Sequence, residues 1–341
     1  MVLIERMSQF QFKFDVTSSS QARTISAPPQ EEQRNKESLV SSNEKSRPFQ
    51  LIDDLSTRLR KRRQERLDYV TVDLPADSLL APLLQVQSTV TAGVDSTFDK
   101  ILHDIDHQKT DIIPGVYEGG LQVWECSLDL CYYLARHFDE IFANNATSVL
   151  ELGCGHGLPA CLVLREGLER KRNISVMFTD YNDFVLQGVT LSNIVLNTQG
   201  MLSTKNELDT TIVDKVILGA GDWLDMSNQL RSGSLREECS SLPSNGQFDV
   251  ILAAESTYTA QTARDTAALL ALHLKPESGI GLVACKRYYF GVGGGSDAFR
   301  EAAASLPNSN EYRLSVETLQ TCDSGIGNIR DLLKLKMEKC S

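Results

Sequence analysis

A short apolar run that ends in a glycine loop constrains this sequence most. Residues 148–152 read Ser-Val-Leu-Glu-Leu, and residues 153–157 read Gly-Cys-Gly-His-Gly. A run of leucine and β-branched residues of this length, ended by glycines, is typical of a buried parallel strand. Three glycines in five residues let the backbone approach a bound molecule where a side chain would intervene. The stretch therefore predicts a strand-to-helix turn with a ligand at the carboxyl end of the strand.

The chain after this turn alternates between apolar runs and stretches with helical periodicity. This alternation predicts an α/β fold with a doubly wound, mainly parallel sheet. Further strands are expected at 174–180, 213–218, 248–254, 281–285, 312–316 and 329–335, after an earlier short strand at 69–72. Helices are expected at 158–168, 184–196 and 262–273, and another follows residue 126. The Ser- and Asn-rich residues 226–246 have the composition of a surface insertion.

The spacing of the glycines narrows the choice of ligand. Gly153, Gly155 and Gly157 form Gly-x-Gly-x-Gly, whereas a nicotinamide dinucleotide site has Gly-x-Gly-x-x-Gly. With Glu151 the pattern resembles the first motif of the seven-strand methyltransferases that use S-adenosylmethionine; a tight turn without a ligand is the alternative. Asp180 ends the second predicted strand, where a carboxylate can accept hydrogen bonds from both ribose hydroxyls. These two features together favour the S-adenosylmethionine site.

The other predicted strand ends carry side chains suited to a cofactor and an acceptor. After the third strand, Asp222 can accept from the adenine amino group and Trp223 can pack beside it. Residues 255–258 follow the fourth strand, where the transferred group is expected to meet its acceptor. The glycine-rich stretch 286–295 lacks the Gly-Lys-Ser/Thr ending of a nucleotide-hydrolysing loop and is expected to form a mobile substrate loop edged by aromatic side chains. Trp124 either covers the ligand or closes the sheet edge as a core residue.

Composition places the chain among ordinary globular proteins, with 41% apolar and 23% charged residues and no apolar run of 18. The eight cysteines form no Cys-x-x-Cys pair, so no metal site or redox motif is indicated, and Cys126, Cys131, Cys154 and Cys161 are expected in the core. Residues 1–66 carry 13 basic and 9 acidic side chains, or +4, so that the net charge of −11 leaves −15 on the other 275 residues. Such an acidic body either attracts a basic protein substrate or merely aids solubility.

The N-terminal residues are expected to form an arm outside the catalytic domain. Their polar composition predicts a largely disordered arm at 1–66 and a domain at 67–341, in which 67–145 is an N-terminal extension of strand and helix. Residues 10–16 alternate apolar and polar side chains like an added strand or a docking peptide. The basic cluster 58–66 is interpreted as an import signal, an RNA contact or the solvated face of a helix.

Seven motifs together resemble the eukaryotic protein-histidine methyltransferases. They are 114–120 (Pro-Gly-Val-Tyr-Glu-Gly-Gly), 124–126 (Trp-Glu-Cys), 151–157, 180–182 (Asp-Tyr-Asn), 221–223 (Gly-Asp-Trp), 255–258 (Glu-Ser-Thr-Tyr) and 289–295. The resemblance covers about residues 100–335, and 10–14 resembles that family's N-terminus. It implies a seven-stranded Rossmann-like class I methyltransferase sheet with helices on both faces, the last strand antiparallel, and an N-terminal extension. It also implies transfer of a methyl group from S-adenosylmethionine to a histidine imidazole nitrogen of a large-subunit ribosomal protein.

The same resemblance assigns roles to individual positions. The residues expected to contact the cofactor are Trp124, Glu125, Glu151, Gly153, Cys154, Gly155, Asp180, Tyr181, Asn182, Gly221, Asp222, Trp223 and Ala254. Glu255 and Tyr258 are expected to face the acceptor, where related lysine methyltransferases usually carry Asp-x-x-Tyr. The expected partner is a basic large-subunit ribosomal protein, and neither a membrane partner nor a nucleic-acid substrate is expected. The enzyme is expected to be a monomer in the cytoplasm and nucleus.

The chemistry of the acceptor decides what Glu255 must do. A neutral imidazole, with a reference pKa of about 6.5, is already a nucleophile near pH 7. Glu255 can accept the N–H of the non-reacting nitrogen and stabilise the developing imidazolium, while Tyr258 orients the ring. A protein-lysine methyltransferase, whose acceptor must first lose a proton, is one alternative, and a non-catalytic cofactor-binding chaperone for a ribosomal protein is another. A nucleic-acid methyltransferase is disfavoured, because residues 254–258 lack the Asp/Asn-Pro-Pro-aromatic clamp for base amines.

Overall fold

The computed structural model describes residues 47–75, 80–86, 112–113, 116–144, 146–201, 205–306, 311–325 and 328–340, which all belong to one compact unit. The arm up to residue 46, its alternating stretch 10–16 and the first two residues of the motif 114–120 lie outside the described residues.

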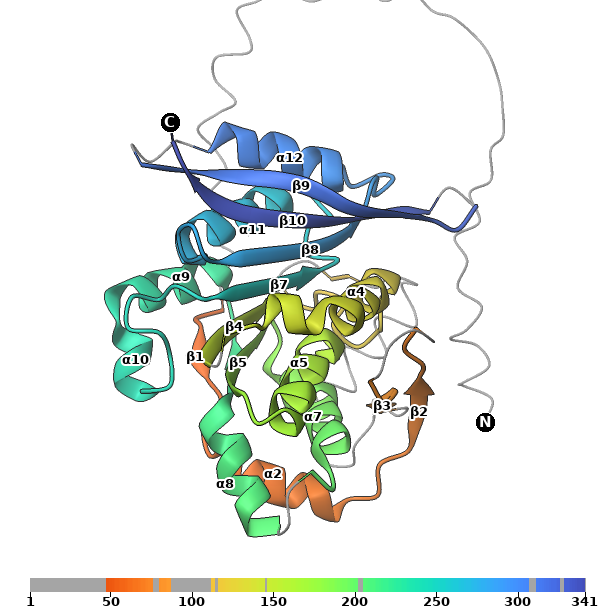
Figure 1. Ribbon diagram of the computed structural model, residues 1–341, viewed down its shortest axis with the longest axis vertical. Coiled ribbons are helices and arrows are strands. Elements are labelled where there is room, and N and C mark those ends of the chain that lie inside the picture. The colour runs from red at the N-terminus through yellow and green to blue at the C-terminus, as the bar shows by residue number, and fades with distance from the viewer. Residues whose placement is uncertain are drawn as a thin grey trace, which may run out of the picture. The chain divides into compact units, whose positions relative to one another are not determined.

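Eight strands of the described chain form one sheet (Figure 1). The strands are β1 (Gln50–Leu51), β4 (Ala146–Leu152), β5 (Asn173–Asp180), β6 (Val216–Ala220), β7 (Val250–Ala254), β8 (Ile280–Lys286), β9 (Tyr312–Asp323) and β10 (Ile329–Lys339). Their order is β1-β6-β5-β4-β7-β8-β10-β9. Strands β6, β5, β4, β7 and β8 are parallel, whereas β10 runs antiparallel to both of its neighbours. Leaving β1 aside, this is the seven-stranded class I methyltransferase sheet, and the predicted fold class is confirmed.

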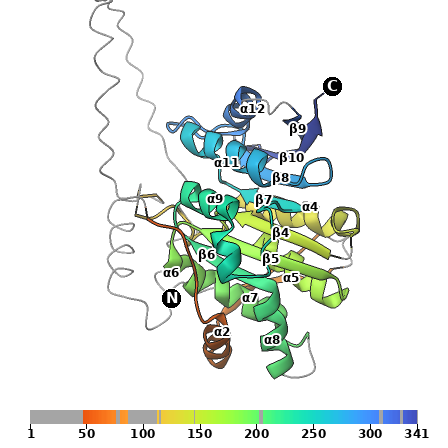
Figure 2. The ribbon, with the colours of Figure 1, turned by 90° about the vertical axis from the view of Figure 1, so that its left-hand side faces the viewer.

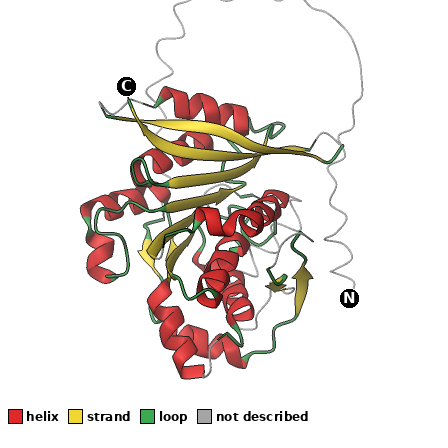
Figure 3. Cartoon of the chain, in the orientation of Figure 1, coloured by secondary structure: helices red, strands yellow, loops and turns green. Residues whose placement is uncertain are grey.

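Helices cover both faces of the sheet (Figures 2 and 3). They are α2 (Leu55–Gln64), α4 (Glu125–Ile141), α5 (Leu158–Glu169), α6 (Asp183–Val185), α7 (Leu191–Thr198), α8 (Lys205–Lys215), α9 (Trp223–Ser232), α10 (Ser234–Glu238), α11 (Ala260–His273) and α12 (Ser296–Ser305). A π-helical turn, Leu186–Thr190, joins α6 to α7. Helices α4, α5 and α7 lie on one face, and α9, α11 and α12 lie on the other. Outside the sheet, β2 (Tyr69–Val72) pairs with β3 (Leu83–Val86), which confirms the predicted strand at 69–72.

Alternate residues of the central strands enter two different cores. Val149 of β4 packs with the helices of the first face, whereas Leu150 and Leu152 pack with those of the second. All three side chains are fully buried, and burial of each contributes about 1.5–3 kcal/mol. A strand covered on both faces has no side exposed to solvent, which explains why apolar residues occupy both sides of β4 before the glycine loop. The exception, Glu151, is buried as well and accepts a hydrogen bond from the backbone amide of Ala160.

The predicted boundary of the arm at residue 66 differs from the structure. β1 adds an antiparallel strand beside β6, and Phe49 is buried at that edge. In α2, Leu59 is fully buried, while Arg58 bonds to Asp53 and Arg62 to Glu65. Among the described residues, the basic cluster therefore forms a helix face on the domain, as the third interpretation expects.

Residues 226–246 are not a simple surface insertion, and that prediction is wrong. Asp222 caps α9 by accepting hydrogen bonds from the backbone amides of Leu224 and Asp225, at 2.8 and 3.1 Å. Met226 and Leu230, one helical turn apart, are buried in the second core. Of the serines and asparagines that suggest a loop, Ser227 lies in this helix and is itself buried, 2.8 Å from the Nε2 atom of His273.

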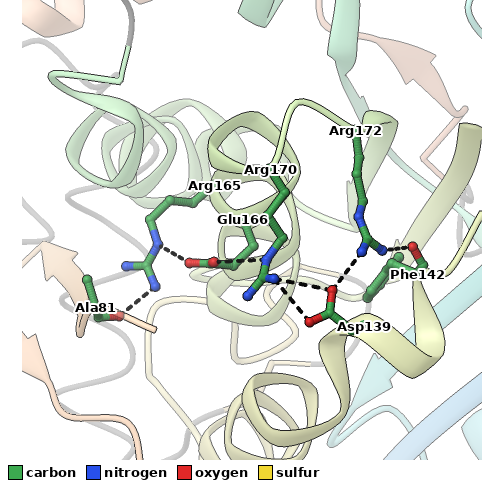
Figure 4. A network of polar contacts seen from close by, with 7 residues as sticks. All are labelled: Ala81, Asp139, Phe142, Arg165, Glu166, Arg170 and Arg172. Atoms are coloured by element: carbon green, nitrogen blue, oxygen red, sulfur yellow. Dashed lines mark hydrogen bonds and ion pairs between the residues drawn. The ribbon is translucent and has the colours of Figure 1, made fainter. Parts of the chain in front are cut away.

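Arginines on and after α5 tie the first-face helices together (Figure 4). Arg165 donates to the carbonyl oxygen of Ala81 at 2.6 Å, just before β3. Arg170 and Arg172 both pair with Asp139 of α4, at 3.1 and 2.6 Å. These contacts hold α4 against α5, and with it the Trp124 segment that precedes α4.

Within the described residues, no helix is both long enough and apolar enough to cross a membrane.

Candidate active site

A cavity of about 540 Å³ lies at the carboxyl ends of β4, β5, β6 and β7. This is where ligands bind in open α/β sheets, and the volume lies within the range for small-molecule sites. Of the predicted site residues, the cavity is lined by Trp124, Gly153, Cys154, Gly155, Asp180, Tyr181, Gly221, Asp222, Trp223, Ala254, Glu255 and Tyr258. The sheet thus brings together side chains from five separate parts of the chain.

The glycine loop forms the floor of the cavity. Gly153, Gly155 and Gly157 have φ angles of +59°, +51° and +65°, in the left-handed region that favours glycine. A β-carbon on Gly155 would lie 3.0 Å from the carbonyl oxygen of Gly120. The loop leads into α5, whose N-terminal backbone amides face the carboxyl edge of the sheet. A ligand can therefore lie directly on the backbone.

Asp180 is a buried carboxylate at the end of β5. Its two oxygens accept hydrogen bonds from the backbone amides of Gly155 and Asn182, each at 3.0 Å. Burial is the main cause that raises the pKa of Asp180 to about 6, while these hydrogen bonds act in the opposite direction. Because a carboxylate oxygen has two lone pairs, each oxygen can still accept from a ribose hydroxyl. The position fits the role predicted for this residue.

The end of β6 forms the wall expected beside adenine. Trp223 lies 3.4 Å from where a β-carbon on Gly153 would be, so its indole borders the glycine loop. The segment before β1 supports this wall, since the backbone amide of Asp222 donates to the carbonyl oxygen of Arg47 at 2.9 Å. The Arg47 guanidinium lies 5.5 Å from the ring centroid of Tyr181, which also lines the cavity. Residues missing from the predicted site thus buttress both strand ends.

Two tyrosine–carboxylate pairs contain the residues that are predicted to face the acceptor, Glu255 and Tyr258. The hydroxyl of Tyr289 donates to Oε2 of Glu255, and the hydroxyl of Tyr258 donates to Glu118. Burial, and then the facing carboxylate, raises the pKa of Tyr258 and of Tyr289 above the usual value of about 10. Both phenols therefore keep their protons near neutral pH and stay hydrogen-bond donors.

Glu255 is unusual in its backbone conformation and in the surroundings of its carboxylate. Its φ of +56° is rare for a residue other than glycine, and such strain is concentrated at functional sites. Its Oε1 atom is buried and accepts no hydrogen bond of normal geometry in the part of the chain that the structure describes, although the thiol of Cys126 lies near enough for Glu255 to help raise the pKa of that thiol after burial. An unsatisfied buried acceptor costs about 1–3 kcal/mol. A donor on a ligand would remove that cost.

Three predicted cofactor residues do not line the cavity. Glu125, the first residue of α4, faces the β9–β10 hairpin and bonds to Asn328. Glu151 is buried below the loop and accepts from the backbone amide of Ala160 at 3.2 Å. Asn182 is fully buried and donates to the carbonyl oxygen of Val116 at 2.7 Å. Glu151 and Asn182 can therefore shape the loops around the site without touching a ligand.

The cavity is negatively charged. Its described lining includes the carboxylates of Glu118, Asp180, Asp222, Glu255 and Asp265 and neither lysine nor arginine. A histidine of the lining, His156, is buried, and burial lowers its pKa. Such a cavity favours cationic ligands and repels phosphates.

The sequence-based prediction missed Glu118 and Tyr289 as site residues. Both stand inside motifs of the family resemblance, but neither follows a parallel strand directly, so strand-end reasoning does not select them. Only the fold shows that their side chains meet Tyr258 and Glu255.

The lining fits S-adenosylmethionine on three observations: the exposed glycine backbone at 153–157, Asp180 with remaining acceptor capacity, and carboxylates that complement a sulfonium cation. The orphaned Oε1 belongs to Glu255, the residue directly after β7. Only the placement of the side chains is observed, so the predicted roles of individual residues stay predictions.

Residues 113–217 match a family model described as lysine methyltransferase. Among curated relatives, the histidine protein methyltransferase 1 homolog of Dictyostelium discoideum is 33% identical over 227 residues, 67% of this chain and 60% of the relative. Histidine protein methyltransferase 1 of Schizosaccharomyces pombe is 31% identical over 64% of this chain and 65% of the relative. That of Saccharomyces cerevisiae is 27% identical over 81% of this chain and 82% of the relative. The chain thus spans about 60 to 65% of the length of the first two relatives.

Among solved structures, a class I S-adenosylmethionine-dependent methyltransferase from Listeria monocytogenes, titled putative, is similar with a TM-score of 0.42 and 13% identity, over 71% of this chain and 67% of that one. The fold assignment rests on the strand order and not on this score. In sequence, the chain is therefore similar to the histidine protein methyltransferases, and its central part has the pattern of the lysine methyltransferase family.

Proposed function

We propose that this protein transfers a methyl group from S-adenosylmethionine to an imidazole nitrogen of a histidine in a basic large-subunit ribosomal protein. The observation that carries the proposal is Glu255, a carboxylate with an orphaned buried oxygen at the acceptor end of a fitting cofactor cavity. The names of the relatives support histidine as the acceptor, and the family resemblance supports the ribosomal substrate. On this proposal the protein acts as a monomer in the cytoplasm and nucleus.

The residues that would hold the cofactor surround the glycine loop. Asp180 would accept from the ribose, Trp223 and Asp222 would enclose the adenine, and Trp124 would cover the methionine end. The indole nitrogen of Trp124 donates to the carbonyl oxygen of Gly119 at 3.1 Å, which fixes the ring beside the cavity. When bound, S-adenosylmethionine supplies an electrophilic methyl group, and the chain positions the acceptor.

Glu255 provides what a histidine acceptor needs. The reacting nitrogen of a neutral imidazole uses its own lone pair, so a base is not required before attack. Oε1 of Glu255 would accept the N–H of the other nitrogen, which selects the tautomer with the reacting lone pair free. As the ring becomes an imidazolium, this hydrogen bond gains a cationic donor and strengthens. The product can then release its N–H proton to solvent through the carboxylate.

A lysine acceptor is the second candidate, because the matching family model is described as lysine methyltransferase. The two acceptor-end carboxylates, Glu118 and Glu255, would suit an ammonium group. However, an ammonium with a reference pKa of about 10.4 must lose a proton before it can attack, and a carboxylate is a much weaker base than the amine, whereas a neutral imidazole needs no such step.

The test is incubation of the full chain with methyl-labelled S-adenosylmethionine and large-subunit ribosomal proteins from cells that lack the enzyme. Mass spectrometry of the labelled protein identifies the modified residue, which we expect to be a histidine. Tight binding of S-adenosylhomocysteine without any incorporation would support the chaperone alternative instead.

A further inference from the structure

The loop after β8 presents three apolar side chains to solvent within five residues. Tyr288, Phe290 and Val292 have exposed fractions of 53%, 74% and 53%. Other large apolar side chains exposed in the described chain, such as Tyr69, are separated from one another in sequence. Single exposed apolar residues are ordinary, whereas a cluster indicates a contact surface. We call residues 288–293 the aromatic loop.

The aromatic loop is fastened to the acceptor end of the cavity. A β-carbon on Gly294 would lie 2.1 Å from the carbonyl oxygen of Thr257, so the two backbones are in direct contact. The backbone amide of Gly295 donates to the same carbonyl at 2.8 Å, and Gly293 pairs with Thr259 in a β-bridge. The contacts hold the base of the loop at a fixed position relative to Glu255. Whatever binds the exposed side chains is thereby placed beside the acceptor.

The charge around this loop favours a basic polypeptide. Of the two cations at its start, Arg287 pairs with Asp331 at 2.7 Å, and Lys286 lies over the rings of Trp124 and Tyr289, at 5.4 and 5.8 Å from their centroids. The cavity beside it is lined by five carboxylates, and residues 67–341 carry a net charge of −15. Nucleic acid and anionic membranes would be repelled by this surface. A polypeptide segment with an apolar side chain flanked by basic residues would complement both the exposed apolar side chains of the loop and the negative charge around it.

We propose that the aromatic loop docks an apolar side chain of the substrate protein, close in sequence to the methylated residue and flanked by lysines or arginines. The proposal rests on the proposed function and adds to it a rule for substrate choice: the acceptor alone is not sufficient, and its neighbours must cover Phe290 and Val292. Central aromatic side chains of this kind commonly dominate a binding surface.

The test compares Phe290→Ser/Val292→Ser with Tyr69→Ser, a matched control that removes an exposed aromatic ring on β2. The probe is the large-subunit ribosomal protein fraction from cells that lack the enzyme, with labelled S-adenosylmethionine. We expect kcat/KM for methyl incorporation to fall about tenfold or more in the loop variant and to stay within twofold in the control. The Kd for S-adenosylhomocysteine and the unfolding temperature should be unchanged in both, which separates docking from folding.

A second pair of variants tests the charge of the partner. Phe290→Lys should lose more activity than Phe290→Glu, because the former repels a basic segment. Equal losses would overturn the basic partner, and a loop variant as active as Tyr69→Ser would overturn docking, while the proposed function would stand in either case. If the wild-type chain incorporates no label into any protein, the proposed function itself fails and docking fails with it.

Discussion

Replacing the carboxylate of Glu255 by an amide isolates its electrostatic contribution to transfer. Glu255→Gln keeps the size of the side chain and an oxygen that can accept from Tyr289. A hydrogen bond to a charged group contributes about 1.5–3 kcal/mol and a neutral one about 1 kcal/mol, so the variant loses about 0.5–2 kcal/mol in the transition state. Since 1.36 kcal/mol is a factor of ten in rate, kcat should fall about 2- to 30-fold.

The assay measures single-turnover incorporation of label and, separately, the Kd for S-adenosylhomocysteine by calorimetry. Cofactor affinity should change less than twofold, because Glu255 lies at the acceptor end. Glu125→Gln is the matched control: its side chain makes the same chemical change but faces Asn328 and Arg330 outside the cavity. Wild-type kcat in Glu255→Gln, or a loss confined to cofactor affinity, would refute the catalytic role of the carboxylate.

Three further predictions concern the cofactor site and its surroundings. Gly155→Ala should weaken S-adenosylhomocysteine binding about tenfold or more in calorimetry, because the β-carbon meets a carbonyl oxygen at 3.0 Å and φ is +51°; unchanged affinity would contradict the loop geometry. Arg47→Ala removes a 3.2 Å ion pair to Asp183 and the cation over Tyr181, together about 1 kcal/mol, so the same Kd should rise about fivefold; no change would show that this segment does not support the site. Burial raises the pKa of Glu151 from 4.5 to about 8, so the folded chain holds a proton that the unfolded chain releases, and between these pH values stability should fall as pH rises. Glu151→Gln should flatten the dependence of the apoprotein's unfolding temperature on pH between 5 and 8, and an unaltered slope would argue against this origin.

Much of the fold could be predicted because the central strands are buried on both faces. Such strands leave mainly apolar runs, and the runs predicted at 174–180 and 281–285 lie within β5 and β8. Where a strand follows a helix without a glycine or proline between them, the predicted boundary is displaced. The third strand is predicted at 213–218, but residues 213–215 end α8, and β6 extends to Ala220. The local pattern of apolar residues does not show where a helix ends and the next strand begins.

The strand at the edge of the sheet, β1, could not be predicted from the sequence, for a different reason. β1 has two residues, and what holds it is non-local: Phe49 fills the space above Gly219, where a β-carbon would lie 2.3 Å from its ring. A glycine in a buried strand signals such a close approach, but the partner lies 170 positions earlier. Its identity follows only from the folded chain.

The residues of the candidate site also fall into two groups, those that could be predicted from the sequence and those that could not. Residues directly at strand ends, such as Asp180 and Glu255, could be selected because parallel strands bring their carboxyl ends to one edge. Glu125 was selected with Trp124 by motif, but at the start of a helix adjacent side chains point about 100° apart, and only Trp124 faces the cavity. Glu118 and Tyr289 lie in loops, and the periodicity of the sequence does not predict the course of a loop.

The proposed histidine methylation is tested most directly by amino-acid analysis of ribosomal protein that the full chain has labelled with methyl-labelled S-adenosylmethionine. We predict that the label elutes as methylhistidine and that Glu255→Gln lowers its yield. Label that elutes as methyllysine alone would contradict the tautomer-selecting role of Glu255 and favour the lysine alternative.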